Sequence, residues 1–303
     1  MVLWHWGRLL VIWILSLNVL IIKEETKMKK KVTVPEIIAS KGGDKVYTMI
    51  TCYDYTNAKL VDESDVDMIL VGDSMGMTML GYKGTVGVTV DDIIYHTKTV
   101  VKGAPNTSVI GDMPFGSYNV DIADAVRNAN RIFVEGGCDC IKLEGGSEVA
   151  PVIKAIVTAG IPVCAHIGLT PQTSAMMGGF KVQGKSLEAA QKLLDDARAV
   201  AEAGAFMVVV EGIPKMLADV ITEKISIPTM GIGAGAGCDM QVLVAQDMLG
   251  MNEWVPKLAK KYADLRTAIL DAYNTYVKEC NERSFPDKDH QYNTVIEGIE
   301  NLK

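Results

Sequence analysis

This chain of 303 residues carries a formal net charge of −7 at pH 7, and 49% of its residues are hydrophobic. Its acidity argues against a nucleic-acid partner, because an acidic surface repels a phosphodiester backbone. The length and the ordinary share of charged residues, 22%, suit one ordered globular domain of the size of a large α/β barrel.

The first 27 residues differ from the rest of the chain. Residues 1–22 are almost wholly apolar, with Arg8 as their one charged side chain, and the charged stretch 23–31 follows directly. Three interpretations compete: a signal peptide without a small-residue cleavage site, a signal anchor with a lysine-rich flank, and an upstream in-frame extension with synthesis beginning at Met28. The incomplete targeting signal favours the third. It places residues 1–27 outside the fold and the catalytic domain at 28–303.

Eight short apolar runs follow, and each gives way to a polar or glycine-rich corner. Such runs, separated by stretches long enough for a helix, are typical of buried parallel strands with helical crossovers. Their repetition predicts an α/β fold, a single-domain (β/α)8 TIM barrel with a C-terminal helical extension. The runs expected to form strands lie at 48–52, 67–72, 107–111, 139–143, 161–165, 206–210, 227–232 and 242–246.

Helical patterns and two long loops lie between these runs. Residues 74–106 form a long insertion, glycine-rich at first and then helical at 91–101, in which His96 is expected to be a packed histidine rather than a ligand. Residues 170–185 are rich in glycine and methionine, which indicates a lid or a substrate-contacting loop. One long helix is expected at 257–280. Further amphipathic helices are expected at 124–134, 148–159 and 186–203.

Three carboxylates stand at the ends of strands two, three and four: Asp73, Asp112 and Glu144. The C-terminal ends of barrel strands face one mouth, so these side chains should converge and repel one another unless a cation or protons compensate. Oxygen ligands with room for water favour Mg²⁺ over Zn²⁺. The competing interpretation is that each acid caps the helix that follows. Three acids in register favour the metal site.

Lys142 and Glu144 are two residues apart, so both point to the same face of an extended strand. A buried lysine there needs an anion, and a substrate carboxylate and a salt bridge with Glu144 are equally favoured. His166 ends strand five and either donates to a developing oxyanion or bonds a neighbouring carbonyl, the first being favoured by its position.

Glu211 closes strand six after four apolar residues, 207–210. Apolar surroundings raise the pKa of a carboxylate and suit it to act as a general base, and the alternative is a glutamate paired with lysine at the rim. The glycine-rich stretch 231–237 loosely matches a dinucleotide-binding fingerprint. Its place after strand seven instead favours contact with a phosphate or with the substrate.

The six cysteines are scattered, and several fall within expected strands. They indicate reduced, buried thiols of a cytoplasmic protein rather than a disulfide scaffold. Cys138 and Cys140 have the spacing of half a metal site, but no second Cys or His pair accompanies them, which favours simple packing.

Seven motifs in unchanged order, spread over residues 32–263, closely resemble the ketopantoate hydroxymethyltransferase family, also called 3-methyl-2-oxobutanoate hydroxymethyltransferases. Any one of these motifs alone is weak, whereas seven in order make coincidence very improbable. They are VGDSMGM at Val71–Met77, TVDDIIYHT at Thr89–Thr97, GDMPFGSY at Gly111–Tyr118, IKLEGG at Ile141–Gly146, HIGLTPQ at His166–Gln172, GGFKVQG at Gly178–Gly184 and GIGAG at Gly231–Gly235.

The resemblance implies a cytoplasmic transferase of pantothenate biosynthesis that moves a hydroxymethyl group from 5,10-methylenetetrahydrofolate to 3-methyl-2-oxobutanoate, giving 2-dehydropantoate through a Mg²⁺-stabilised enolate. It also implies a homo-oligomer, commonly a decamer. By the family pattern the metal residues are Asp73 and Asp112 with Glu144 in the shell of the ion, the residues that bind the oxo acid are Asp73, Ser74, Asp112 and Lys142, and the catalytic residues are Glu211, as proton acceptor, and His166.

Two departures and two rivals accompany the resemblance. Gln246 stands where the family often has histidine before Asp247, and residues 1–27 have no family counterpart. The nearest rival is a Mg²⁺-dependent lyase or mutase of the phosphoenolpyruvate mutase and isocitrate lyase type, which usually carries a lid with a nucleophilic cysteine that is not apparent here. A catalytically silent barrel that senses folate or an oxo acid is disfavoured because every metal carboxylate is present.

Overall fold

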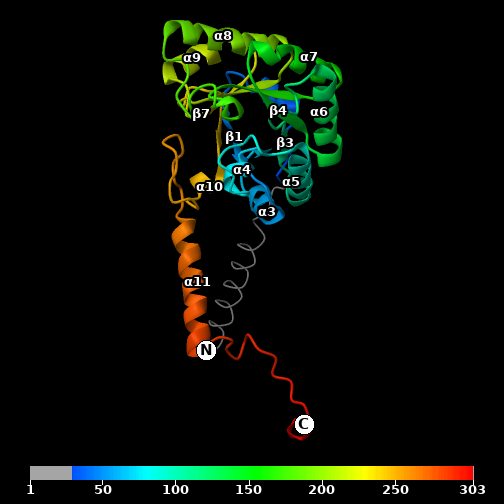
Figure 1. The fold of residues 1–303 in the computed structure, drawn as a ribbon, viewed down its shortest axis with the longest axis vertical. Coiled ribbons are helices and arrows are strands. Elements are labelled where there is room, and N and C mark those ends of the chain that lie inside the picture. The colour runs from blue at the N-terminus through cyan, green and yellow to red at the C-terminus, as the bar shows by residue number, and fades with distance from the viewer. Residues whose placement is uncertain (1–28, 303) are drawn as a thin grey trace, which may run out of the picture.

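The computed structural model describes residues 29–302, so the interpretations of residues 1–27 fall outside the described residues. Eight parallel strands pair in sequence order and close into a barrel, with β1 hydrogen-bonded to β8 (Figure 1). The TIM-barrel prediction is therefore confirmed. The strands are β1 Tyr47–Thr51, β2 Met68–Val71, β3 Ser108–Asp112, β4 Cys140–Glu144, β5 Val163–Gly168, β6 Met207–Glu211, β7 Thr229–Ile232 and β8 Met240–Leu243.

Helices follow most strands and cover the outside of the barrel (Figure 1). None of the helices within residues 29–302 combines the length and the apolar content needed to cross a bilayer. The helices are α2 Val34–Ala39, α3 Tyr55–Glu63, α4 Met75–Thr78, α5 Val90–Gly103, α6 Ile122–Gly136, α7 Ala150–Thr158, α8 Leu187–Glu202, α9 Lys215–Lys224, α10 Ala245–Met248 and α11 Leu265–Glu282, and the short 3₁₀ turns are η1 Ser147–Val149, η2 Pro171–Thr173 and η3 Ile299–Asn301.

The hydrophobic core has two shells, as the period of two in a barrel strand requires. Alternate strand residues such as Met49, Met207 and Met230 fill the inside of the barrel, and Ile37 of α2 is fully buried against them. The intervening residues pack outward against the helices. Filled in this way, the barrel is a scaffold, and polar side chains are left to gather at the ends of its strands.

Three predicted elements had wrong boundaries. The fifth strand is Val163–Gly168 rather than 161–165, because its pairing with β6 continues to Gly168, opposite Glu211. The eighth strand is Met240–Leu243 rather than 242–246, because Met240 pairs with Tyr47 and Met230 of the neighbouring strands. Gln246 consequently lies in α10. The last helix begins at Leu265 rather than 257, because the carboxylate of Asp264 accepts a hydrogen bond from the backbone amide of Thr267 and caps it there.

The end of β5 approaches β6 closely at Gly168. Its φ of 95° lies in the left-handed region, and a Cβ added at this position would collide with the carbonyl oxygen of Glu211. That oxygen accepts a hydrogen bond of 2.8 Å from the amide of Leu169. The glycine therefore holds the ends of the two strands together, which brings His166 of β5 near Glu211 of β6.

Asp239 ties the start of β8 to neighbouring segments. Its carboxylate accepts hydrogen bonds from the backbone amides of Thr229 (2.8 Å) and Gly42 (2.9 Å) and pairs with Lys41 at 2.9 Å. Burial disfavours its charge, but these three partners together hold the pKa of Asp239 below its usual 3.8. The carboxylate is therefore stabilising above about pH 4, and this contribution is lost as the pH falls through the lowered pKa.

Asp239→Asn is expected to lower the free energy of unfolding by about 2 kcal/mol at pH 7. The difference between wild type and variant should shrink between pH 5 and pH 2, because the wild-type carboxylate becomes protonated there. Urea unfolding followed by circular dichroism across this range measures both quantities. A difference that stays constant with pH would contradict the assignment.

Candidate active site

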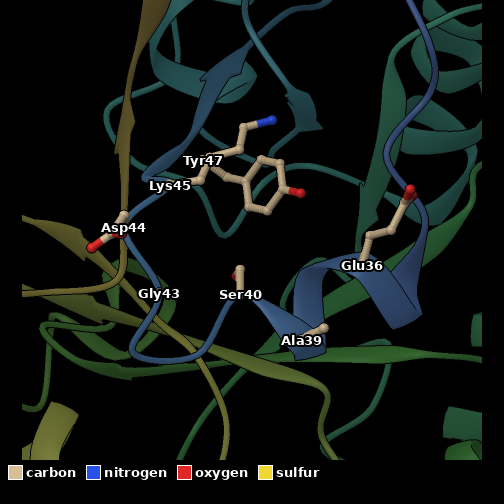
Figure 2. Close-up of a pocket in the computed structure, with 7 residues that line it drawn as sticks. All are labelled: Glu36, Ala39, Ser40, Gly43, Asp44, Lys45 and Tyr47. Carbon is tan, nitrogen blue, oxygen red and sulfur yellow. The ribbon is translucent and has the colours of Figure 1, made fainter.

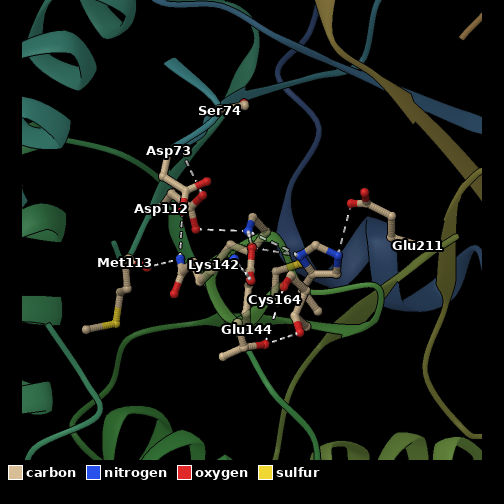
Figure 3. A network of polar contacts seen from close by, with 12 residues as sticks. Asp73, Ser74, Asp112, Met113, Lys142, Glu144, Cys164 and Glu211 are labelled. Atoms are coloured by element: carbon tan, nitrogen blue, oxygen red, sulfur yellow. Dashed lines mark hydrogen bonds and ion pairs between the residues drawn. The ribbon is translucent and has the colours of Figure 1, made fainter. Parts of the chain in front are cut away.

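A buried polar network occupies the mouth of the barrel, where strands β2 to β6 end (Figure 3). Five of its side chains are at most 4% exposed, and the carboxylate of Glu211 is 15% exposed. Residues from five different strand ends thus share one small volume, as the barrel geometry predicts. The members named by sequence reasoning are Asp73, Asp112, Lys142, Glu144, His166 and Glu211.

Lys142 lies at the centre of the network. Its Nζ is 3.0 Å from Oδ1 of Asp112 and 3.9 Å from Oε1 of Glu144, and it is 3.5 Å from Nδ1 of His166. The pairing of β3 with β4 sets Asp112 opposite Lys142, which explains why the shorter contact crosses between strands. The salt bridge with Glu144, one of the two predicted alternatives, is therefore the longer of the two ion-pair contacts of Lys142.

The aspartates and Glu144 are connected by hydrogen bonds. The backbone amide of Asp73 donates to Oδ2 of Asp112 at 3.0 Å. The side-chain amide of Gln172 donates to Oδ2 of Asp73 at 2.8 Å, and the backbone amide of Gln172 donates to Oε2 of Glu144 at 3.0 Å. Buried carboxylates need such donors, since an unpaired charge away from water is costly.

His166 lies between two carboxylates. Its Nδ1 is 3.5 Å from Oε1 of Glu144, and its Nε2 is 3.3 Å from Oε2 of Glu211. Burial and Lys142 oppose protonation, but the contacts with Glu144 and Glu211 prevail and raise the pKa of His166 to about 9. The imidazole is therefore protonated at neutral pH. Among the described residues, Glu211 forms its ion pair with this histidine, not with a lysine at the rim.

Burial and mutual repulsion act on the aspartates. Burial, followed by the charges of Asp112 and Glu144, raises the pKa of Asp73 well above its usual value. Burial also raises the pKa of Asp112, with Lys142 opposing it. Glu144 differs: although burial opposes ionisation, its contacts with His166 and Lys142 lower its pKa. The two aspartates are thus the carboxylates whose charge is least compensated within the protein.

The helix-capping interpretation is wrong for the three acids at the ends of β2, β3 and β4, but it describes the role of another strand-end acid, Asp54. Asp54, at the end of β1, accepts a hydrogen bond from the amide of Asn57 and caps α3. The residues that cap the elements after β2, β3 and β4 are Ser74, Asp121 and Gly146. Asp73, Asp112 and Glu144 are therefore free to face the network.

Ser74 lies apart from the network in Figure 3. Its hydroxyl is 2.8 Å from the hydroxyl of Tyr53. The side chain is half-buried beside the mouth, so its expected role toward a substrate stays a prediction.

The structure adds two residues that sequence reasoning missed as site residues, Gln172 and Tyr118. Both are buried, and the Tyr118 hydroxyl donates to Oε1 of Gln172 at 2.6 Å while it accepts from the amide of Glu144 at 3.2 Å. They lie on loops, where no strand period tells which way a side chain points. The available signal was their place at the ends of the GDMPFGSY and HIGLTPQ motifs.

The carboxylates at the mouth of the barrel are possible ligands of a divalent cation. Within residues 29–302 no three His, Cys, Asp or Glu side chains form a ready-made metal site. With all carboxylates ionised, Lys142 and protonated His166 leave an excess of two negative charges in the network. Oδ1 of Asp112 is buried and faces the ammonium of Lys142 at 3.0 Å. Two carboxylates plus substrate oxygens and waters are the usual ligands of Mg²⁺, so the residues fit this ion.

Other sequence-derived candidates have structural explanations. His96 is half-buried, and its Nδ1 is 2.6 Å from the carbonyl oxygen of Tyr53, which confirms the packed histidine. The stretch 231–237 runs from β7 to β8 without a helix, so the dinucleotide interpretation lacks the helix N-terminus that it needs. All six cysteines are free, and five of them, including Cys138 and Cys140, are buried.

A separate hollow of about 330 Å³ lies between α2 and the start of β1 (Figure 2). Lys45 lies over the ring of Tyr47 there, with its Nζ 3.9 Å from the ring centre. Since this hollow lies at the N-terminal end of a barrel strand, it is remote from the mouth where the polar network gathers.

The fold and the site together define a class: a TIM-barrel enzyme with an acidic, lysine- and histidine-containing centre at its strand ends. The sequence profile described as ketopantoate hydroxymethyltransferase matches residues 31–288. The chain belongs to the ketopantoate hydroxymethyltransferase family.

Relatives and solved structures agree with this assignment. Over 266 residues the chain is 55% identical to 3-methyl-2-oxobutanoate hydroxymethyltransferase of Heliobacterium modesticaldum, with 88% of this chain and 96% of the relative covered. It is 56% identical over 253 residues to the protein of the same name from Clostridium novyi, with 83% and 92% covered. The expected enzyme family is thereby confirmed.

The structural neighbours include the class of the nearest rival. A phosphonopyruvate hydrolase matches with a TM-score of 0.57 and 12% identity, covering 87% of this chain and 92% of that one. A 2,3-dimethylmalate lyase of the PEP mutase/isocitrate lyase superfamily matches with a TM-score of 0.56 and 17% identity, covering 86% and 92%. At such identities the likeness shows the shared fold alone.

Proposed function

We propose that the chain transfers a hydroxymethyl group from 5,10-methylenetetrahydrofolate to 3-methyl-2-oxobutanoate in the cytoplasm, giving 2-dehydropantoate, with Mg²⁺ at Asp73 and Asp112. The observation that carries the proposal is the buried network at the ends of β2 to β6. It lies in a chain that is 55% identical to a 3-methyl-2-oxobutanoate hydroxymethyltransferase. A phosphonopyruvate hydrolase of the same fold has been crystallised in complex with oxalate and Mg²⁺.

Asp73 and Asp112 would hold the ion, with Glu144 in its shell. Bound there, Mg²⁺ would supply Lewis-acid chemistry that would acidify the proton on C3 of the oxo acid. Lys142 lies 3.0 Å from Asp112 and offers its ammonium to the substrate carboxylate. Ser74, at the start of α4, lines the same side as Asp73 and would contact the oxo acid.

Glu211 would accept the C3 proton. It is the most exposed carboxylate of the network and lies on the rim, so a substrate bound at the aspartates can reach it. Protonated His166, 3.3 Å away, orients the Glu211 carboxylate and brings positive charge close to the bound oxo acid. The enolate carbon then forms a bond to the methylene carbon carried by the folate, and both carbon–nitrogen bonds of that carbon break. Water supplies the hydroxyl oxygen of the product, and the proton taken from C3 and the second proton of the water go to the two folate nitrogens.

The test is a product assay with and without chelation. Purified protein with Mg²⁺, 3-methyl-2-oxobutanoate and 5,10-methylenetetrahydrofolate is expected to form 2-dehydropantoate, followed by mass spectrometry. EDTA should abolish the product and added Mg²⁺ should restore it. Undiminished activity after exhaustive chelation would refute the metal, and absence of product with Mg²⁺ present would refute the reaction.

We also propose that the chain forms a homo-oligomer, with the decamer as the expected size, in which α11 of one copy covers β1 and β8 of another. In Figure 1 α11 runs away from the barrel, and none of its residues is buried. The outward positions of β1 and β8 lack the cover that other strands have: Thr48 is exposed, and Ile50 and Leu243 are half-buried. An apolar stripe on α11, which includes Ile269, Tyr273 and Tyr276, fits such a surface.

Tyr276→Glu is expected to dissociate the assembly, because it places a charge on the apolar stripe of α11. Asn274→Glu adds the same charge on another face of the helix and serves as the control. Light scattering after size-exclusion chromatography gives both masses. Equal masses for wild type and Tyr276→Glu would contradict the proposed contact.

A further inference from the structure

Gln172 lies outside the barrel strands but is hydrogen-bonded to two carboxylates of the network. It is 3% exposed and takes part in four hydrogen bonds. Its backbone amide donates to Oε2 of Glu144, and its side-chain amide donates to Oδ2 of Asp73 and, at 3.0 Å, to the carbonyl oxygen of Met113. Gln172 thus connects three segments: the end of β2, the loop that follows β3, and the end of β4.

Tyr118 determines which way the Gln172 amide points. The Tyr118 hydroxyl accepts a hydrogen bond from the amide of Glu144, so its own proton is available for Oε1 of Gln172, 2.6 Å away. With Oε1 occupied, Nε2 must face Asp73. Burial is the main cause that raises the pKa of Tyr118, which keeps the hydroxyl protonated and able to donate.

These bonds select one oxygen of each aspartate. Oδ2 of Asp73 accepts from Gln172, and Oδ2 of Asp112 accepts from the amide of Asp73. Among residues 29–302 no hydrogen bond reaches Oδ1 of Asp73, whereas Oδ1 of Asp112 faces the ammonium of Lys142 at 3.0 Å. Asp73 therefore keeps Oδ1 for a cation. Donors of this kind orient metal ligands, and their loss commonly weakens metal binding.

Gln172 also connects the site to the glycine- and methionine-rich loop. It lies in η2, Pro171–Thr173, at the N-terminal stem of residues 170–185. Farther along, this loop is open to solvent: Met176 is 91% exposed and Phe180 54%. The stem is anchored to Asp73 and Glu144, while the remainder of the loop projects outward.

We propose that Gln172, held by Tyr118, is a positioning residue that aims Asp73 at the bound cation and couples the order of the 170–185 loop to occupancy of the site. The inference rests on the proposed Mg²⁺ site. In this proposal Gln172 does not bind the metal itself but orients a residue that does. The 170–185 loop then responds to the metal through Gln172 and not through direct contact with the ion.

Three variants test the positioning role by calorimetric titration with Mg²⁺. Gln172→Met keeps the length of the side chain but removes its donors, and it is expected to weaken Mg²⁺ binding about 10- to 100-fold. Tyr118→Phe removes one hydroxyl and should weaken it less. Because Tyr118 acts through Gln172, the double variant should bind no more weakly than Gln172→Met. Gln183→Met makes the same chemical change elsewhere in the loop and should leave the affinity unchanged.

The outcomes separate the inference from the function on which it rests. If the wild-type protein does not bind Mg²⁺, the proposed metal site fails. If it binds Mg²⁺ and folded Gln172→Met binds it equally well, the positioning role is overturned. Additive losses in the double variant would overturn the relay through Tyr118. If Gln172→Met does not fold, Tyr118→Phe alone decides, and unchanged affinity there overturns the relay.

Trypsin cleavage reports on the loop independently of catalysis. Lys181 and Lys185 are exposed cleavage sites within it. Mg²⁺ with 3-methyl-2-oxobutanoate should slow cleavage at these lysines in the wild type. At concentrations that saturate each protein, the protection should be lost in Gln172→Met and kept in Gln183→Met. Equal protection in both variants would refute the coupling.

Discussion

Asp112→Asn is expected to lower kcat/KM for hydroxymethyl transfer about 100- to 1,000-fold. Asparagine keeps the volume and still accepts the hydrogen bond from the amide of Asp73, but it supplies no charge to a cation. It also removes the carboxylate 3.0 Å from Nζ of Lys142, the shortest ion-pair contact of that lysine. Mg²⁺ affinity, measured by calorimetry, should fall together with the rate. Asp112→Ala should abolish turnover.

Asp139→Asn is the matched control for this change. Asp139 also pairs with a lysine, Lys31, at 2.9 Å, but it precedes β4 at the opposite end of the barrel from the mouth. Its replacement should leave kcat/KM within about twofold of the wild type, since its carboxylate is remote from the reacting atoms. Full activity in Asp112→Asn, with the control also active, would remove Asp112 from the proposed site.

Glu211→Gln is expected to lower kcat about 100- to 10,000-fold, because the amide cannot accept the proton from C3 of the oxo acid. Mg²⁺ affinity should change little, since Glu211 lies on the far side of His166 from the aspartates. Exchange of the C3 proton with deuterium oxide, followed by proton NMR without folate, isolates this step. In the variant the exchange should fall as far as turnover does.

A second readout of Glu211→Gln is the ionisation of His166. Contact with Glu211 is one of the causes that raise the pKa of His166 to about 9, so removal of the charge should lower this pKa. NMR titration of the imidazole measures the change. Glu211→Asp, which keeps the charge on a shorter side chain, should retain more exchange than Glu211→Gln. Wild-type exchange in Glu211→Gln would assign proton removal to another group.

Sequence reasoning reached the strand-end residues because barrel geometry converts a position in the chain into a position in space. Asp73, Asp112 and Glu144 each follow an apolar run, and all strand ends of a barrel share one mouth. The same reasoning placed Lys142 and Glu144 on one face, by the period of two along a strand. It offered a substrate carboxylate or Glu144 as the partner of Lys142, whereas the β3–β4 register brings Asp112 closer than Glu144.

The contacts of loop side chains and the packing of exposed surfaces could not be predicted from strand periodicity. Gln172 and Tyr118 lie outside regular strands, so only the folded chain shows that they connect Asp73 with Glu144. The end of β8 was misplaced for a related reason: the apolar residues continue past Leu243 into α10, and composition does not show where strand pairing stops. The local sequence does not show that α11 projects away from the barrel, because an amphipathic helix can pack equally well within one chain or between two chains.

The amino-acid sequence by itself determined the barrel, the order of its strands and the chemical type of the residues at its mouth, because hydrophobic periodicity and strand ends are local properties. Only the tertiary structure shows which carboxylate oxygens accept hydrogen bonds, that contacts with Glu144 and Glu211 raise the pKa of His166, and that the side-chain amide of Gln172 donates to Asp73. These features depend on distances between segments far apart in the chain, and packing sets such distances.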